Sequence, residues 1–357
     1  MWLIVQLPQP LRMTLGGWLG RLFFRLTPYR RAISATNLAI AFSALDDATR
    51  QELLRAHAES IGRGIIETGM AWFLSEKRLL ALSRFEADPA ALALLRDPHT
   101  PVILIGSHST LMELGVRLLG LYVKAGGMYR PLNDPFFHHW IRHHRARAAT
   151  ELIHYKDMRH TLHFLQAGGN LWYALDQDMG PRVSVFAPFF GLDAASVNIL
   201  PKLRERTGAH WVPVYMWREE NRYIVRVAAE IKPEEGETDT DVMRRVNADY
   251  EAEICRYPEQ YYWLHRRYKT ARTAAATLIR NGDDAESTPP PPFSSPRSPP
   301  ENTMHSTLPP SGPLPPLPQQ PTAGCPRRLR YQPSRHLLLP RRMALPGHRL
   351  HRAGLPA

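Results

Sequence analysis

The most informative segment of the chain runs from Ile103 to Arg117 and reads I-L-I-G-S-H-S-T-L-M-E-L-G-V-R. The apolar run 101–105 predicts a buried strand, residues 106–107 predict a turn, and the sequence from Thr110 onward predicts a helix. A strand that passes directly into a helix is typical of α/β folds, which place their sites at such junctions. The junction here therefore predicts both the fold class and the position of a site.

His108 and Glu113 are the candidate catalytic pair of this junction. A neutral histidine close to a carboxylate is the minimal equipment for removing a proton from a hydroxyl. Side chains five residues apart on a regular helix point roughly 140° apart, so the pair can meet only if His108 precedes the helix. Residues 110–113 fit a capping box, with Thr110 as N-cap and Glu113 reaching back toward the helix start. The residues alone leave an alternative, in which Glu113 only caps the helix and His108 is an ordinary turn histidine.

Further elements follow from the same reading of the chain. The run Leu171–Leu175 is nearly all apolar, as expected of a parallel strand covered on both faces. Capping residues and periodicity predict strands at 211–217 and 223–228, and helices from Asp46-Asp47 to about Phe73, from Asp134-Pro135 onward, and from Asp239 to about Cys255. Strands that alternate with helices predict one α/β domain, with a central, mostly parallel sheet flanked by helices.

The N-terminal residues 1–26 are apolar with scattered arginines. No uninterrupted stretch reaches the roughly 20 apolar residues of a spanning helix. Arg12, Arg21 and Arg25, together with Trp18, predict a segment that lies at a membrane surface. No charged region precedes the apolar run and no small-residue cleavage site follows it, which argues against a cleavable signal peptide. The alternative is a buried first helix.

The formal charge of +12 is concentrated at the C-terminus. Eight arginines and no acidic residue follow Glu301, so subtracting eight from +12 leaves about +4 for the rest of the chain. This mildly basic body argues against a nucleic-acid-binding protein. Nineteen of the 33 prolines fall between Pro289 and Pro356, where no core can be buried, which predicts disorder. We therefore expect a membrane-associated segment at 1–26, a main domain at 27–273 and a Pro/Arg-rich disordered tail at 274–357.

A histidine followed by four residues and an acid resembles the signature of lysophospholipid and glycerolphosphate acyltransferases. Four more blocks occur in order with it: Glu67–Phe73, Tyr129–Pro135, Trp172–Pro181 and Pro258–Lys269. Together they resemble the late acyltransferases of lipid A biosynthesis, most of all the lauroyl-transferring members. The resemblance runs from about Trp2 to Arg272 and does not include the tail. Family members usually carry more apolar residues before the equivalent of Trp2, so we expect the membrane anchor of this chain to be partial.

The resemblance implies a glycerolphosphate-acyltransferase-like fold and a specific reaction. An acyl chain, lauroyl or similar, would move from an acyl carrier protein thioester to a hydroxyl of a 3-hydroxyacyl chain on a Kdo-bearing lipid A precursor. A thioester is already activated, so the reaction needs a base and oxyanion donors and requires no cofactor or metal. The expected location is the cytoplasmic face of the inner membrane, with membrane lipid as a further partner and no nucleic acid.

The resemblance also assigns roles to four residues. His108 matches the general base and Glu113 the acid that orients it, while Arg145 and Asp176 match an arginine and an aspartate needed for activity. Arg145 would bind a lipid phosphate or stabilise developing negative charge, and Asp176 would position that arginine or the sugar hydroxyls. The alternatives are a solvated basic face for Arg145 and a cap or turn residue for Asp176, and the role of Asp178 stays open.

Three competing interpretations remain on sequence grounds. His138, His139, His143 and His144 suggest a metal site, but no nearby acidic or cysteine ligand completes one, so we expect no metal and a basic helix that faces anionic lipid. A glycerophospholipid or lysophospholipid acyltransferase shares the His-x4-acid core and is the nearest alternative activity. A basic membrane- or nucleic-acid-binding protein without catalysis is the alternative from another class.

Overall fold

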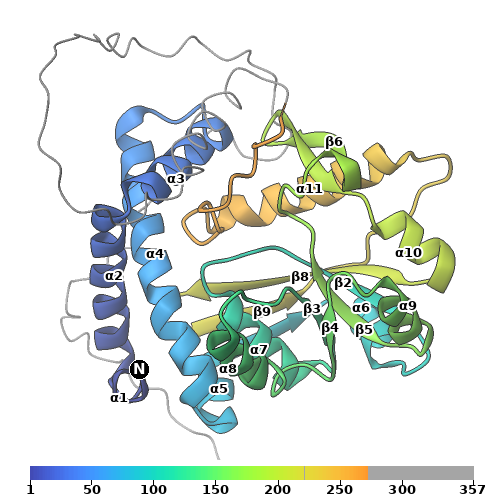
Figure 1. The fold of residues 1–357 in the computed structure, drawn as a ribbon, viewed down its shortest axis with the longest axis horizontal. Coiled ribbons are helices and arrows are strands. Elements are labelled where there is room, and N and C mark those ends of the chain that lie inside the picture. The colour runs from blue at the N-terminus through green and yellow to red at the C-terminus, as the bar shows by residue number, and fades with distance from the viewer. Residues whose placement is uncertain (221, 272–357) are drawn as a thin grey trace, which may run out of the picture. The chain divides into compact units, whose positions relative to one another are not determined.

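The computed structural model describes residues 1–220 and 222–271, and its central sheet is flanked by helices on both faces (Figure 1). The helices are α1 Trp2–Val5, α2 Gln9–Leu26, α3 Pro28–Ala41, α4 Asp47–Phe73, α5 Glu76–Leu82, α6 Pro89–Arg96, α7 Met112–Tyr122, α8 Pro135–Arg145, α9 Met158–Gln166, α10 Leu200–Thr207 and α11 Asp239–Arg256, with a 3-10 turn at Pro181–Val183. The strands are β1 Ser83–Ala87, β2 Val102–Gly106, β3 Gly126–Tyr129, β4 Leu152–His154, β5 Asn170–Ala174, β6 Ser184–Phe189, β7 Leu192–Val197, β8 His210–Glu219 and β9 Arg222–Val227. The predicted tail, 274–357, lies outside the described residues.

The seven-stranded sheet has the order β1-β9-β8-β2-β5-β3-β4. Among these strand pairs only β8 and β9 run antiparallel, so the predicted α/β class with a mostly parallel sheet is confirmed. Strand β2 is central and buried along its whole length, because β5 and β8 flank it and helices cover its faces. A separate hairpin of β6 and β7 packs on α11 and was not predicted from the sequence.

The elements with strong local signals lie where the sequence places them. The four predicted strands correspond to β2, β5, β8 and β9. Helix α4 begins after Asp46, whose side chain accepts a hydrogen bond from Thr49 N at 2.7 Å. Helix α8 begins after Asp134, whose side chain accepts from Phe137 N at 2.8 Å. Side-chain caps satisfy the free amides of a helix start within three residues, so they can be read from sequence.

The capping box predicted at the start of α7 is wrong. The helix begins at Met112, its N-cap is Leu111, and no side chain caps it. The hydroxyl of Thr110 lies instead 2.7 Å from that of Ser60 on α4. The Thr110 side chain therefore hydrogen-bonds to a helix distant in the sequence and does not cap α7.

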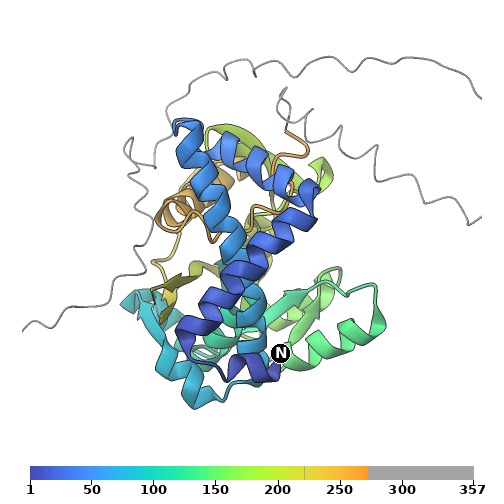
Figure 2. The ribbon, with the colours of Figure 1, turned by 90° about the vertical axis from the view of Figure 1, so that its left-hand side faces the viewer.

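Helix α2 packs lengthwise against α4 on the outside of the domain (Figures 1 and 2). The contact is made by glycines, because a Cβ atom on Gly20 would overlap the backbone of Ala58 and Gly62. Gly17, on the same helix, has room for a Cβ atom at ordinary van der Waals distance from its neighbours. The N-terminal segment is therefore packed against the domain along one side, as in the alternative of a buried first helix.

Large apolar side chains of the N-terminal segment remain exposed, as do Arg21 and Arg25. Trp2, Leu3, Leu11, Trp18 and Leu26 are each between 53 and 75% exposed. Among the helices of the described ranges, none combines the length and the apolar character needed to cross a membrane.

We expect Gly20→Ala to lower the free energy of unfolding by roughly 1–3 kcal/mol, because the added methyl group forces α2 away from α4. Intrinsic helix propensity acts in the opposite direction, since alanine is favoured over glycine by about 1 kcal/mol. Gly17→Ala is the matched control and should be neutral or slightly stabilising. Denaturant unfolding of both variants measures the difference, and equal stabilities would contradict the close packing of the two helices.

Candidate functional site

His108 lies in the loop between β2 and α7, where its partner is Asp176. The imidazole Nδ1 is 2.7 Å from Asp176 Oδ1, and the backbone amide of His108 donates to Asp176 Oδ2 at 2.9 Å. The two residues meet because β2 and β5 are parallel neighbours with Gly106 in register with Ala174. Each residue stands two positions beyond that pair, at the carboxyl edge of the sheet, where α/β folds place their sites.

The surroundings of Asp176 keep it ionised. Its side chain is only 1% exposed, and although burial raises the pKa of the carboxyl, the imidazole and the hydrogen bonds from His108 lower it, to about 2 overall. A carboxylate can only accept hydrogen bonds, so the network assigns the imidazole proton to Nδ1. Nε2 is then the unprotonated nitrogen of a ring that is 24% exposed and lines a cavity. A base of this kind can take a proton from a hydroxyl bound in the cavity.

The prediction that Glu113 orients His108 is not what the structure shows. The Glu113 carboxylate is held by Arg145, whose Nε lies 3.0 and 3.2 Å from the two carboxylate oxygens and whose Nη2 binds the same group. Because α7 begins at Met112, Glu113 falls in its first turn and faces the end of α8. The solvated-face alternative for Arg145 is thereby wrong, as is the cap-or-turn alternative for Asp176.

A C-terminal segment supports the His108 loop from the other side. Thr110 N donates to Gln260 O at 2.8 Å, and Tyr262 N donates to His108 O at 3.1 Å. The Tyr261 hydroxyl donates to Asp176 O at 3.4 Å. The sequence analysis did not predict these contacts. The block Pro258–Lys269, which is one of the blocks that carry the family resemblance, is the signal that could have indicated them.

Asp178 has a structural part in the same region. Its backbone amide donates to His265 Nε2 at 3.0 Å, and its carboxylate accepts from the amide and hydroxyl of Thr270 at 2.8 and 2.9 Å. Burial lowers the pKa of His265 to about 4, so this histidine is neutral and acts as an acceptor. Asp178 and His265 thus join the turn after β5 to the C-terminal segment.

The site opens onto a cavity of about 250 Å³. Its polar lining comprises His108, Glu113, Tyr129, Arg130 and Arg145. The remaining wall is mostly apolar and includes Met112, Val116, Leu119, Gly127, Ala148, Ala149, Leu152 and Trp172. An apolar cavity with a few convergent polar groups at one side is suited to an amphiphilic ligand whose reacting group lies next to the base.

The four histidines of α8 are spread over different surroundings. The His144 ring stacks on Trp72 with ring centroids 5.0 Å apart, while His139 and His143 line a second cavity. In residues 1–220 and 222–271 no group of three or more potential ligands is placed to hold a metal ion.

A family model and the curated relatives of this chain all point to the acyltransferases of lipid A biosynthesis. The model of the family described as bacterial lipid A biosynthesis acyltransferase matches residues 1–270. The lipid A biosynthesis lauroyltransferase of Escherichia coli (strain K12) is 33% identical over 279 residues, which cover 76% of this chain and 89% of that protein. A lipid A biosynthesis acyltransferase of Haemophilus influenzae is 31% identical over 274 residues, covering 75% and 87% of the two chains. The lipid A biosynthesis palmitoleoyltransferase of Escherichia coli (strain K12) is 32% identical over 282 residues, covering 78% and 91%.

Proposed function

The chain belongs to the bacterial lipid A biosynthesis acyltransferase family, and we propose that it transfers an acyl chain from acyl carrier protein to a Kdo-bearing lipid A precursor. Acyl transfer in lipid A synthesis follows from the family itself. The donor, the acceptor hydroxyl of a 3-hydroxyacyl chain and the mechanism are our proposal. The observation that carries it is the His108–Asp176 pair, in which Asp176 binds Nδ1 of a ring that lines a largely apolar cavity.

The proposed reaction is direct transfer with His108 as general base. Nε2 takes the proton of the acceptor hydroxyl while the hydroxyl oxygen attacks the thioester carbonyl carbon. The tetrahedral intermediate collapses, the carbon–sulfur bond breaks, and the leaving thiolate receives the proton from Nε2. Asp176 stays ionised throughout, holds the ring in its tautomer and stabilises the imidazolium that forms between the two steps.

Arg145 is the proposed stabiliser of negative charge. Its guanidinium lines the same cavity as His108, and the bidentate contact with Glu113 holds its orientation. A preoriented cation beside the thioester carbonyl would stabilise the oxyanion as it develops. In this proposal Glu113 is a positioning residue for Arg145.

The apolar part of the cavity is the proposed site of the acyl chain, and we propose lauroyl or a chain of similar length. The resemblance to a lauroyltransferase supports this choice, although a palmitoleoyltransferase is 32% identical. We further propose that the enzyme works at the cytoplasmic face of the inner membrane. The exposed apolar side chains of residues 1–26 would contact the bilayer there.

Gly127→Leu should shift the donor preference to shorter acyl chains. Gly127 lines the cavity, and a Cβ atom added to it meets no other heavy atom within 4 Å, so we expect a larger side chain to occupy part of the cavity without displacing its neighbours. Since one methylene in an apolar pocket is worth about 1–3 kcal/mol, the ratio of kcat/KM for dodecanoyl over decanoyl donors should fall at least about tenfold. Gly127→Ala is the graded control and should cause a smaller change. An unchanged ratio in both variants would place the acyl chain elsewhere.

The proposed function is tested by assaying the purified chain with dodecanoyl acyl carrier protein and a Kdo-bearing lipid A precursor. We expect one dodecanoyl group to be added per turnover, so the mass of the product should exceed that of the precursor by one dodecanoyl group less the hydroxyl hydrogen that it replaces. Lysophosphatidate serves as the competing acceptor. Acylation of lysophosphatidate but not of the lipid A precursor would overturn the proposal.

A further inference from the structure

A second cavity, of about 320 Å³, lies next to the acyl cavity. One side of it is formed by His139, Arg142 and His143 of α8. Ala149 and Leu152 line both cavities, so only this shared wall separates them. A ligand group in the second cavity would therefore be near the substrates of the proposed reaction.

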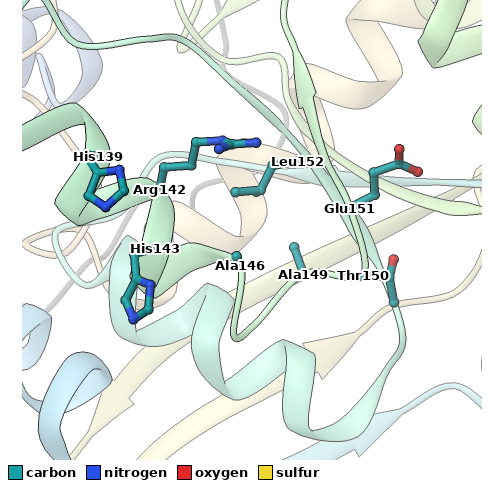
Figure 3. Close-up of a pocket in the computed structure, with 8 residues that line it drawn as sticks. All are labelled: His139, Arg142, His143, Ala146, Ala149, Thr150, Glu151 and Leu152. Atoms are coloured by element: carbon teal, nitrogen blue, oxygen red, sulfur yellow. The ribbon is translucent and has the colours of Figure 1, made fainter. Parts of the chain in front are cut away.

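The second cavity is rich in N–H donors without an anionic partner. Figure 3 shows the Arg142 guanidinium extending across the cavity toward Leu152, with the imidazoles of His139 and His143 on the same side. Within the described part of the chain, no carboxylate forms an ion pair with Arg142. Its guanidinium is therefore available to an anion from solution.

Glu151 belongs to the opposite wall and does not neutralise this side. Its carboxylate points away from the side chains of α8 (Figure 3) and lies 2.6 Å from His160 Nε2. The cavity thus combines a guanidinium, two imidazoles and the exposed hydroxyl of Thr150. This is an anion-binding composition, since a guanidinium fork matches the oxygens of phosphate and imidazole N–H groups add donors at any protonation state.

We propose that this second cavity is a phosphate-ester subsite for a substrate of the acyl transfer. The inference rests on the proposed function, in which both substrates carry phosphate esters. The acceptor carries them on its sugars, and the donor carries one in the prosthetic arm of the carrier protein. The chemistry that recognises the two is the same, and Arg142 is its principal group.

Steady-state kinetics of the full chain test the subsite through Arg142→Gln. We expect KM for the substrate that uses the subsite to rise about tenfold or more while kcat changes less than about twofold, because a charge-assisted hydrogen bond to phosphate is lost. Arg142→Lys keeps the positive charge but loses the paired N–H donors of the guanidinium, so it should give an intermediate KM. Arg55→Gln, which removes an exposed arginine of α4, is the charge-matched control. Identical KM values for Arg142→Gln and Arg55→Gln would overturn the proposal.

Two arms identify the source of the phosphate. A rise confined to KM of the acceptor, which disappears with a dephosphorylated acceptor, assigns the subsite to a sugar phosphate. A rise confined to KM of the donor assigns it to the phosphodiester of the carrier arm. A loss of equal size on phosphorylated and dephosphorylated acceptors, without any change in KM of the donor, overturns the phosphate assignment.

A binding measurement keeps this inference separate from the proposed function. We expect glucosamine 1-phosphate to raise the Tm of the wild-type chain and of Arg55→Gln, and to have a clearly smaller effect on Arg142→Gln. Unphosphorylated glucosamine is the control ligand. No stabilisation of the wild-type chain, or equal stabilisation of all three proteins, overturns the subsite. Failure of the chain to acylate the lipid A precursor would overturn the proposed function. The Tm measurement would still show whether the second cavity binds a phosphate ester, because it does not depend on activity.

Discussion

Replacement of His108 by alanine should lower kcat by about 10²–10⁴-fold, the range that general-base catalysis typically contributes. The side chain is 24% exposed at the cavity wall, and its ring contacts Asp176 rather than the hydrophobic core, so the fold should persist. The purified full chain should be compared with His108→Ala in single-turnover assays with acyl carrier protein donor and lipid A precursor. Thermal unfolding of the same samples checks the fold.

His163→Ala is the matched control for this experiment. His163 is exposed on α9 and lies outside the acyl cavity, so its removal should leave turnover unchanged. Turnover near the wild-type value in a purified and folded His108→Ala protein would reject His108 as the base. A loss of activity accompanied by a large fall in Tm would instead point to a structural role.

Asp176→Asn should be nearly as damaging, by about 10²–10⁴-fold in kcat, although the two side chains have almost the same size. The carboxylate accepts from both the ring and the backbone amide of His108. The NH₂ group of asparagine can donate to Nδ1, which moves the imidazole proton to Nε2 and leaves no base at the cavity. Single-turnover rates measure the loss, and circular dichroism verifies that the variant is folded.

A mutant cycle with His108→Ala distinguishes Asp176 from Glu113 as the partner of the imidazole. Asp176 acts through His108, so Asp176→Asn should cause little further loss in the His108→Ala background. Glu113 contacts Arg145, so Glu113→Gln should cause a similar loss in both backgrounds. The reverse pattern, in which only Glu113→Gln is silent in the His108→Ala background, would restore the pairing predicted from the sequence.

The accuracy of the sequence-based prediction depended on how far apart the interacting residues are. Asp46 and Asp134 cap their helices as predicted, because a capping carboxylate and the backbone amide that donates to it lie within three residues of each other. The apolar strands were recognised because burial on both faces leaves a continuous apolar run. The β6–β7 hairpin carried no such signal, and the start of α7 was misplaced because Ser60, fifty residues away, takes the hydroxyl of Thr110.

In the candidate site, too, the residues could be identified from the sequence but their long-range contacts could not. His108, Glu113, Arg145 and Asp176 were all identified from the sequence, and the structure brings them to one region of the molecule. The observed pairing of His108 with Asp176 was not predicted, because Glu113, the nearest carboxylate along the chain, was taken as the partner of the histidine. Helix α8 was recognised as basic, but the cavity that it lines was not predicted.

The class of fold, the strand-to-helix junction that carries His108 and the family to which the chain is similar could all be predicted from the sequence. These depend on residue types and short-range order, which burial and capping translate directly into structure. The contacts of Asp176 with His108 and of Glu113 with Arg145 could be seen only in the folded chain. Hydrogen-bond partners depend on which strands lie side by side and on the residue at which a helix begins. In this chain both are fixed by contacts between segments far apart in the sequence.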